Sequence, residues 1–291
     1  MPADSTSNTA RVQRRGALYL MSFENVELVR EFPRGQFKYV LFDFDGTISL
    51  LREGWQAIMH PLMVEVICGD TEPTDEIRQR ATDFIDETTG IQTILQMEGL
   101  VEIIREYGFI PEDQILDAQG YKAIYNDRLM VPVNERLARL ASGELTQDEA
   151  CVVGSRDFVA QVAAQDAELY IFSGTNQDDV RNEANKLGVD HHFIEILGAL
   201  RTIKEFSKEK ILTELIAKHD LHGPEVLIIG DGPVEIRLAH ENGCVSIGVA
   251  SDEVKGGLDA SKRERLMKVG ADIIVSDFTE AEALVAYLFE K

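Results

Sequence analysis

Two aspartates separated by one residue follow a short apolar run near the start of the chain. The run Tyr39–Phe42 has the composition of a strand buried on both faces, and Asp43 and Asp45 come directly after it. Parallel α/β sheets place their ligand sites at the carboxyl ends of strands. Because two carboxylates held there repel each other, the pair predicts a proton or a divalent cation between them. A simple turn is the alternative for an isolated Asp-x-Asp-Gly.

Two later segments also place a polar residue directly after an apolar run. Ser173 follows one run, and Asp231 follows another by way of Gly230. If the three strands are parallel, their ends meet at one edge of the sheet. Carboxylates, a hydroxyl and a lysine at such an edge suit phosphoryl transfer. One carboxylate attacks phosphorus, a second acid protonates the leaving alcohol, and positive groups with Mg²⁺ bind the phosphoryl oxygens.

The elements that would position these residues fall into two patterns. From about residue 150 strands alternate with helices, which predicts right-handed crossovers and a parallel sheet. The stretch before it lacks a convincing strand, and its helical patterns lie near residues 55–67, 75–88, 91–107, 113–129 and 133–141.

We therefore predict an α/β fold, with a Rossmann-like parallel sheet core and an inserted all-helical cap domain. The core would comprise residues 36–50 and 149–291, and the cap residues 51–148. Residues 1–16 are polar and rich in Ser, Thr and Ala, and the apolar run at residues 17–21 is too short for a signal-peptide core, so we predict that residues 1–22 form a loose N-terminal tail.

The composition restricts the partners of the protein. The 291 residues carry a formal net charge of −22, which argues against nucleic acid because phosphates are bound by basic residues. Nothing in the sequence is long and apolar enough to span a membrane. The three cysteines show no metal-ligand spacing and are expected to be reduced. We predict a cytoplasmic protein that binds no nucleic acid and no membrane; the oligomeric state stays open.

In this order and context the motifs resemble those of the haloacid dehalogenase-like hydrolase superfamily, and in particular its helical-cap phosphatases. The first family motif, Asp-x-Asp-Gly-Thr, matches residues 43–47 without a departure. The resemblance implies that Asp43 is the nucleophile and a Mg²⁺ ligand. Asp45 would be the general acid/base and would lend its backbone carbonyl to the metal. Phe44, Gly46 and Thr47 are expected to contact the phosphoryl group.

The second and third motifs supply phosphate-binding groups. Ser173, followed by Gly174, matches the strand-end Ser or Thr of the second motif. Three lysines compete for the third motif, because Lys204, Lys208 and Lys210 all lie upstream of the last acidic motif. We choose Lys208, which falls in the first turn of the predicted helix Ser207–His219, as the family's lysine does; Lys204 is the second choice.

The fourth motif is a Gly-Asp pair followed by another acid, which matches Gly230, Asp231 and Glu235. The resemblance implies that Asp231 binds Mg²⁺. Glu235 departs from the commoner Asp at that position. Its longer side chain would reach the same metal or a metal-bound water.

The helical insertion lies between the first and second motifs, which is the position of the family's cap. A cap that closes over the site would exclude water and contact the substrate. Arg52 and Trp55 lie where the chain enters this insertion, and we predict that they contact the substrate. In the alternative, Arg52 pairs with a neighbouring acid and Trp55 packs at the hinge.

The sequence thus predicts a Mg²⁺-dependent phosphatase that hydrolyses a small phosphorylated metabolite through an aspartyl-phosphate. It is similar to phosphoglycolate phosphatases and β-phosphoglucomutases, so a phosphomutase that uses the same Asp pair is the alternative. Dehalogenases are disfavoured because they lack an acid at the position of Asp45. A signalling phospho-aspartate domain is more remote, because such domains are shorter, lack the helical insertion and do not carry the phosphorylated Asp in a first-strand pair. A non-catalytic binding protein is also remote, because Asp43, Asp45, Ser173 and Asp231 are all present. The sequence does not predict which metabolite is the substrate.

Overall fold

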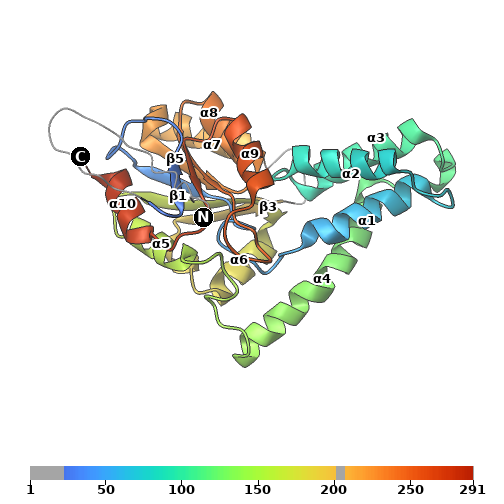
Figure 1. The fold of residues 1–291 in the computed structure, drawn as a ribbon, viewed down its shortest axis with the longest axis horizontal. Coiled ribbons are helices and arrows are strands. Elements are labelled where there is room, and N and C mark those ends of the chain that lie inside the picture. Colours follow the sequence, from blue (N-terminus) through green and yellow to red (C-terminus); the bar gives the residue numbers. More distant parts are fainter. Residues whose placement is uncertain (1–22, 201–206, 291) are drawn as a thin grey trace, which may run out of the picture.

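A seven-stranded sheet forms the centre of the computed structural model, which describes residues 23–200 and 207–290 (Figure 1). The strand order is β1-β7-β6-β5-β2-β3-β4. The strands are β1 (Val26–Leu28), β2 (Tyr39–Phe42), β3 (Glu168–Asn176), β4 (Glu195–Ala199), β5 (Val226–Gly230), β6 (Val245–Val249) and β7 (Ile273–Val275). The predicted tail, residues 1–22, and the second-choice lysine, Lys204, lie outside the described residues.

The six strands from β2 to β7 are parallel, which confirms the predicted Rossmann-like core. Strand β2 lies inside the sheet, between β5 and β3, and each of its residues is buried. Val40 and Phe42 join the apolar cluster on one face, while Tyr39 and Leu41 join the cluster on the other. A strand with both faces covered has to be apolar throughout, as the sequence of β2 is.

Helices cover both faces of the sheet. Helices α5 (Ser155–Ala163), α6 (Gln177–Lys186) and α10 (Ala281–Phe289) contribute to the cluster that contains Phe42. Helices α7 (Lys208–His219), α8 (Pro233–Glu241) and α9 (Ala260–Lys268) pack on the opposite face. Among the described residues, no helix combines the length and the hydropathy needed to cross a bilayer.

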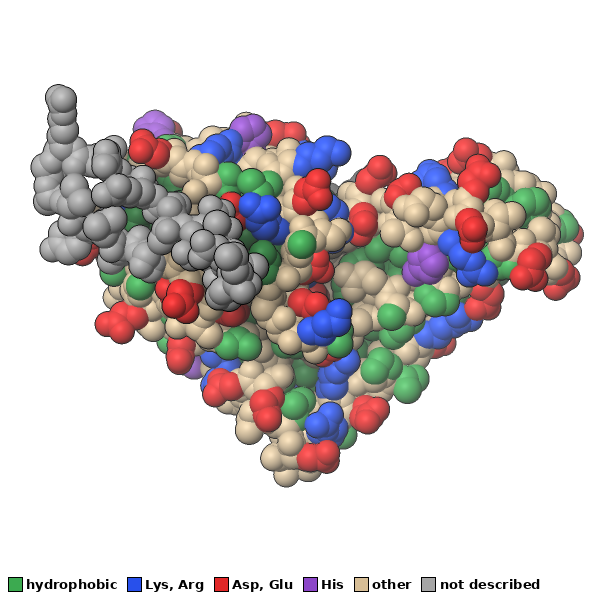
Figure 2. Space-filling model, in the orientation of Figure 1, with side chains coloured by type: hydrophobic (Ala, Val, Ile, Leu, Met, Phe, Trp, Pro, Cys, Tyr) green, Lys and Arg blue, Asp and Glu red, His purple; other side chains and the backbone are tan. Residues whose placement is uncertain are grey.

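Four helices between β2 and β3 form the arm at the right of Figure 1. They are α1 (Trp55–Cys68), α2 (Asp75–Thr88), α3 (Thr93–Tyr107) and α4 (Ala118–Ser142). These helices enclose an apolar cluster of their own, which contains Met59, Leu100 and Tyr125 among others. The space-filling view shows the surface indented where this helical segment meets the sheet, with charged side chains spread over both parts (Figure 2).

Two details differ from the sequence-based expectations. The patterns at 113–129 and 133–141 belong to one helix, because α4 continues through Pro132. The core also begins before residue 36, since β1 adds an antiparallel edge strand beside β7. Strand β1 has only three residues, all of them half-buried, so it lacks the apolar run that marks the inner strands.

Candidate active site

The three polar strand ends lie side by side because β2 pairs with both β3 and β5. Phe42 is in register with Ile171 on one side and with Ile229 on the other. The loop that starts at Asp43 therefore lies between two neighbouring strand ends. One of these strands leads to Ser173, and the other leads to Asp231. Local sequence fixed each turn, and the parallel pairing of three strands distant in sequence brings the turns together.

Lys208 connects two of the buried acids. Its Nζ lies 2.9 Å from Asp43 Oδ1 and also donates to Glu235 Oε1. Helix α7 starts at this lysine, and the Ser207 side chain caps it by accepting a hydrogen bond from the Lys210 N–H, as the sequence suggested. Burial raises the pKa of Asp43 well above its usual value, while the positive charge of Lys208 opposes the shift.

Of the other two candidate lysines, Lys210 does not reach this position. Lys210 is exposed and lies 3.7 Å from Glu214 on its own helix, and Lys204 is not described. The placement of Lys208 beside Asp43 agrees with the choice made from the sequence. That it binds phosphate stays a prediction.

Asp45 is held from two sides. The Thr175 hydroxyl donates to Asp45 Oδ2 at 2.7 Å, and Arg52 Nε lies 3.7 Å from Asp45 Oδ1. Burial raises the pKa of Asp45, and the charge of Arg52 and the Thr175 hydrogen bond both act against that shift. Thr175 was not among the predicted site residues, although its place two residues after Ser173 was a usable signal.

Arg52 makes the acid pair that the sequence left as its alternative role. Its guanidinium donates to both carboxylate oxygens of Glu183 on α6, at 2.6 Å and 3.3 Å. Both side chains are buried. Arg52 still lines the cavity beside Asp45, as does Trp55. Sequence reasoning missed Glu183, because no motif on its helix, 131 residues further along the chain, marks it as a partner of Arg52.

A second buried lysine lies on the other side of the site. Lys262 Nζ on α9 is 3.1 Å from Asp231 Oδ2 and 3.0 Å from Glu253 Oε1. Gly46 is packed against the same acids, since a Cβ atom there would lie 2.4 Å from Asp231 Oδ2. Its φ of +71° also favours glycine. Neither Lys262 nor Glu253 was predicted, because both follow the last recognisable motif.

The donor set fits a hard divalent cation. Five carboxylates around the two lysines leave an excess of negative charge; they belong to Asp43, Asp45, Asp231, Glu235 and Glu253. The Glu235 Oε2 atom is buried and has no hydrogen-bond partner among the described residues. In the described ranges no three acidic, histidine or cysteine side chains already enclose a common metal position. The oxygen-rich, negatively charged edge nevertheless matches the ligand preference of Mg²⁺.

The predicted phosphate-contacting residues divide into two groups. Ser173 and Gly174 line the cavity, as expected. Phe44, Gly46 and Thr47 are not among the lining residues, and the side chains of Phe44 and Thr47 are fully buried. That Phe44, Gly46 and Thr47 contact the phosphoryl group stays a prediction.

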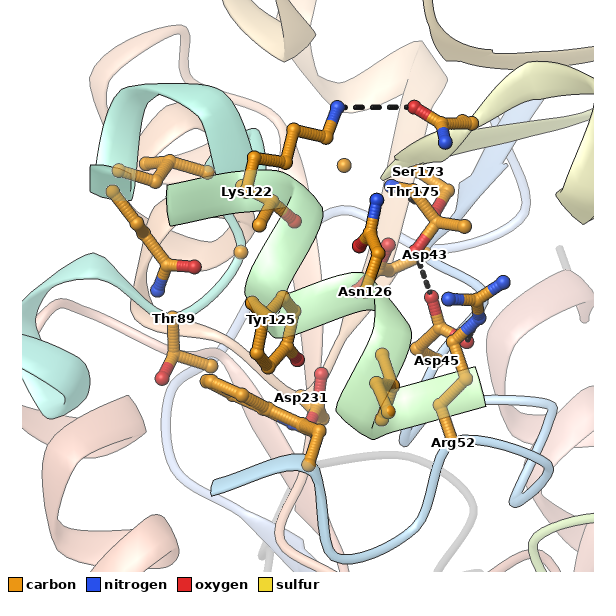
Figure 3. A pocket seen from close by; sticks show the side chains of 18 of the residues that line it. Asp43, Asp45, Arg52, Thr89, Lys122, Tyr125, Asn126, Ser173, Thr175 and Asp231 are labelled. Atoms are coloured by element: carbon orange, nitrogen blue, oxygen red, sulfur yellow. Dashed lines mark hydrogen bonds and ion pairs between the residues drawn. The ribbon is translucent and has the colours of Figure 1, made fainter. Parts of the chain in front are cut away.

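A cavity of about 90 Å³ joins the sheet edge to the helical segment (Figure 3). Asp43, Ser173 and Asp231 line it from the sheet, while Lys122 and Asn126 line it from α4. The loop between α2 and α3 closes one side. The loop approaches β3 so closely that position 174 has to be glycine, because a Cβ atom on Gly174 would lie 2.6 Å from the Ile91 carbonyl oxygen.

Solved structures show the same fold at low sequence identity. A protein described as a predicted phosphoglycolate phosphatase from Haemophilus somnus is 18% identical, with a TM-score of 0.55, 86% of this chain and 98% of that chain covered. β-Phosphoglucomutase from Clostridium difficile is 16% identical, with a TM-score of 0.55 and coverages of 84% and 92%. A predicted phosphatase from Clostridium acetobutylicum is 17% identical, with a TM-score of 0.55 and coverages of 87% and 99%.

The search of curated proteins gave no match. The family model for haloacid dehalogenase-like hydrolases matches residues 40–249, which include all four motifs. This match covers well over half of the chain and confirms the resemblance inferred from the motifs. The protein is a member of the haloacid dehalogenase-like hydrolase family.

Proposed function

We propose that the protein is a Mg²⁺-dependent phosphatase of a small phosphorylated metabolite, with Asp43 as nucleophile and Asp45 as general acid/base. One observation carries the proposal: the two aspartates line the same cavity in different environments. Asp43 contacts the Lys208 ammonium at 2.9 Å, whereas Asp45 accepts from the Thr175 hydroxyl and lies 3.7 Å from the Arg52 guanidinium. A nucleophile has to stay ionised, whereas an acid has to keep its proton until the leaving group needs it.

The reaction would proceed in two displacements. An Asp43 oxygen attacks phosphorus, the bond from phosphorus to the substrate's ester oxygen breaks, and that oxygen takes the proton of Asp45. Asp45 then accepts a proton from water, whose oxygen attacks the aspartyl-phosphate, and the bond between phosphorus and Asp43 breaks to release inorganic phosphate. Burial raises the pKa values of both aspartates, so the charge of Lys208 would have to keep Asp43 ionised while Asp45 holds the proton needed in the first step.

Asp43, Asp231 and the backbone carbonyl of Asp45 would hold the metal. Glu235 would face the metal or a metal-bound water with Oε2, which makes no hydrogen bond to a described residue, while its Oε1 accepts from Lys208. A bound Mg²⁺ would supply positive charge to the phosphoryl oxygens. The Ser173 hydroxyl and the Lys208 ammonium would bind other phosphoryl oxygens.

The helical segment would act as a cap, with residues 51–148 as its extent. Its helices have their own apolar cluster, and it contributes one wall of the cavity. The small cavity and the printed names of the structural neighbours support a small phosphorylated substrate. One neighbour is a β-phosphoglucomutase, so transfer to a sugar hydroxyl in place of water is the second candidate.

The test is release of inorganic phosphate from p-nitrophenyl phosphate in the presence of Mg²⁺. Asp43→Asn should abolish turnover, while Asp70→Asn, which changes an exposed acid of the helical segment, should leave it unchanged. Turnover that survives Asp43→Asn would refute the nucleophile assignment. A sugar phosphate that yields an isomer without free phosphate would favour the mutase.

Metal binding has its own test. Adding Mg²⁺ to metal-free protein should raise Tm, because a ligand that binds only the folded state stabilises it. The rise should be lost in Asp231→Asn and retained in Asp70→Asn. An equal rise in Asp231→Asn would exclude this aspartate as a ligand.

A further inference from the structure

One face of α4 is turned toward the catalytic edge of the sheet. Lys122, Tyr125, Asn126 and Leu129 all line the cavity. Their spacing of three and four residues places them on one side of a helix. Figure 3 shows Asn126 beside Ser173, Thr175 and Asp43, while the Lys122 side chain extends from the helix toward the end of β3, where it donates to Asn176. The helical segment thus presents a polar pair to the position where the phosphoryl group would bind.

Lys122 differs from the other cations that line the described part of this cavity. Arg52 is paired with Glu183, and Lys208 with Asp43 and Glu235. Lys122 Nζ donates to the neutral side-chain oxygen of Asn176, at 3.1 Å, and forms no ion pair with a described residue. Burial lowers the pKa of Lys122, and the charge of Asp179 opposes this shift only in part. A partly buried ammonium without a carboxylate partner is a ready position for an anion.

Asn126 strengthens this interpretation. It lies one helical turn after Lys122, and its side chain makes no hydrogen bond to the residues described in the structure. An amide N–H₂ provides two donors, and an ammonium group provides three. Together these donors suit an oxyanion with several lone pairs.

The contact with Asn176 locates the anion. Asn176 ends β3 and lines the same cavity as Ser173, so the Lys122 ammonium lies in this cavity beside the end of β3. Asp43 and Asp45 repel any further anion at the sheet edge itself. A second anionic group of the substrate would therefore lie on the side of α4, only a few bonds from the phosphate ester.

We propose that Lys122 and Asn126 form a subsite for a second anionic group, a carboxylate or a second phosphate, carried by the substrate. The inference rests on the proposed phosphatase function and narrows its substrate class to small acidic phosphate esters. Lys122 determines specificity in this assignment and takes no part in the phosphoryl transfer.

The experiment measures binding to the Asp43→Asn protein with Mg²⁺, so that turnover is not needed. The ligands are 3-phosphoglycerate and glycerol 3-phosphate, which differ by a carboxylate in place of a hydroxymethyl group. A second pair, glucose 1,6-bisphosphate and glucose 6-phosphate, tests a second phosphate. Calorimetry should show tighter binding of the acidic member of at least one pair.

Adding Lys122→Met should weaken binding of that ligand by about 10- to 100-fold, the usual value of a charge-assisted hydrogen bond. Binding of its counterpart, which lacks the second anionic group, should stay almost unchanged. Lys122→Arg should restore part of the preference. Arg128→Met is the matched control, since it removes a cation from the exposed side of α4, where Arg128 pairs with Glu65. This control should alter neither affinity.

If Lys122→Met weakens the binding of both ligands of a pair equally, the proposal is overturned, because Lys122 would then contact the phosphoryl group that both ligands share. No weakening, or no preference for an acidic ligand in the Asp43→Asn protein, would overturn it as well. Failure of the phosphatase proposal has a different signature, namely no turnover of any phosphate ester by the unsubstituted protein. The Tm of each variant, measured alongside, distinguishes lost contacts from lost folding.

Discussion

Arg52 and Glu183 form a buried, two-pronged ion pair that ties the start of the helical segment to α6 of the core. The same guanidinium lies 3.7 Å from Asp45 Oδ1. From the other side, Arg136 on α4 donates to the backbone carbonyls of Leu51 and Glu53. Residues 51–53, where the chain enters the helical segment, are therefore held by contacts on both sides. One of these contacts is to Asp45, the proposed general acid/base.

The first prediction concerns the pH dependence of stability. Burial raises the pKa of Glu183 from 4.5 to about 7, although the Arg52 charge opposes it. Between these values the folded protein holds a proton that the unfolded chain has lost. The free energy of unfolding should therefore fall as the pH rises through this range, by up to ~1.4 kcal/mol per pH unit from this group.

Glu183→Gln should flatten that slope in the metal-free protein. Urea unfolding at several pH values from about 5 to 8 measures it. Asp43 and Asp45 are present in both proteins, so the difference between the two slopes reports mainly on Glu183. Identical slopes would show that Glu183 is already ionised across the whole range.

The second prediction concerns the Thr175 hydroxyl, whose hydrogen bond lowers the pKa of Asp45. Thr175→Val removes this donor while keeping the shape of the side chain. The pKa of Asp45 should rise further, and the alkaline limb of the kcat/KM profile should move to higher pH. At neutral pH kcat/KM should fall about tenfold, because Asp45 loses an orienting contact.

Thr175→Ser retains the hydroxyl and serves as the control. Its profile should lie close to that of the unsubstituted protein. If Thr175→Val leaves the alkaline limb of the kcat/KM profile unchanged, the ionisation of Asp45 does not determine that limb.

The third prediction concerns Lys208 and Glu235, which are both buried and in contact. Removing one member of a buried ion pair leaves an uncompensated charge and costs about 3–5 kcal/mol. Lys208→Met should therefore destabilise the metal-free protein strongly. Adding Glu235→Gln should recover part of this loss, because it removes one of the acids that the lysine neutralises.

A double-mutant cycle on urea unfolding measures the coupling between these residues. We expect a coupling energy of about 1–3 kcal/mol. Additive effects of the two substitutions would mean that Lys208 stabilises the fold through its contact with Asp43 alone and not through Glu235.

The fourth prediction concerns Gly46, whose φ is +71°. Alanine in the left-handed region costs about 1–2 kcal/mol. At Gly46 its Cβ would also lie 2.4 Å from Asp231 Oδ2 and displace that carboxylate. Gly46→Ala should therefore lower the free energy of unfolding and remove the rise of Tm with Mg²⁺.

Gly143 offers a matched control, because its φ is +79° and a Cβ atom there would meet nothing within 4 Å. Gly143→Ala should show the backbone cost and keep the full response to Mg²⁺. If Mg²⁺ raises the Tm of both variants equally, the space that Gly46 leaves free is not needed for metal binding.

Much of the core could be predicted from the sequence, because the signals were local. The buried strand β2 needs apolar residues on both faces, and the acids follow it in the chain. Ser207 marked the start of α7, and the family resemblance, which places a lysine in the first turn of that helix, led to the choice of Lys208. The break expected at Pro132 was wrong, because packing of α4 against the other helices of its cluster overrides the local penalty.

The sequence by itself determined the acids at the strand ends, their order and the insertion of helices between them, because these depend on residues adjacent in the chain. Only the tertiary structure decided which charges face one another. Glu183, Lys262 and Lys122 lie on helices without a recognisable motif, and their contacts cross 131, 31 and 54 residues of chain. Such pairs arise when strand order and helix packing bring distant faces together, and neither periodicity nor spacing along the chain encodes them.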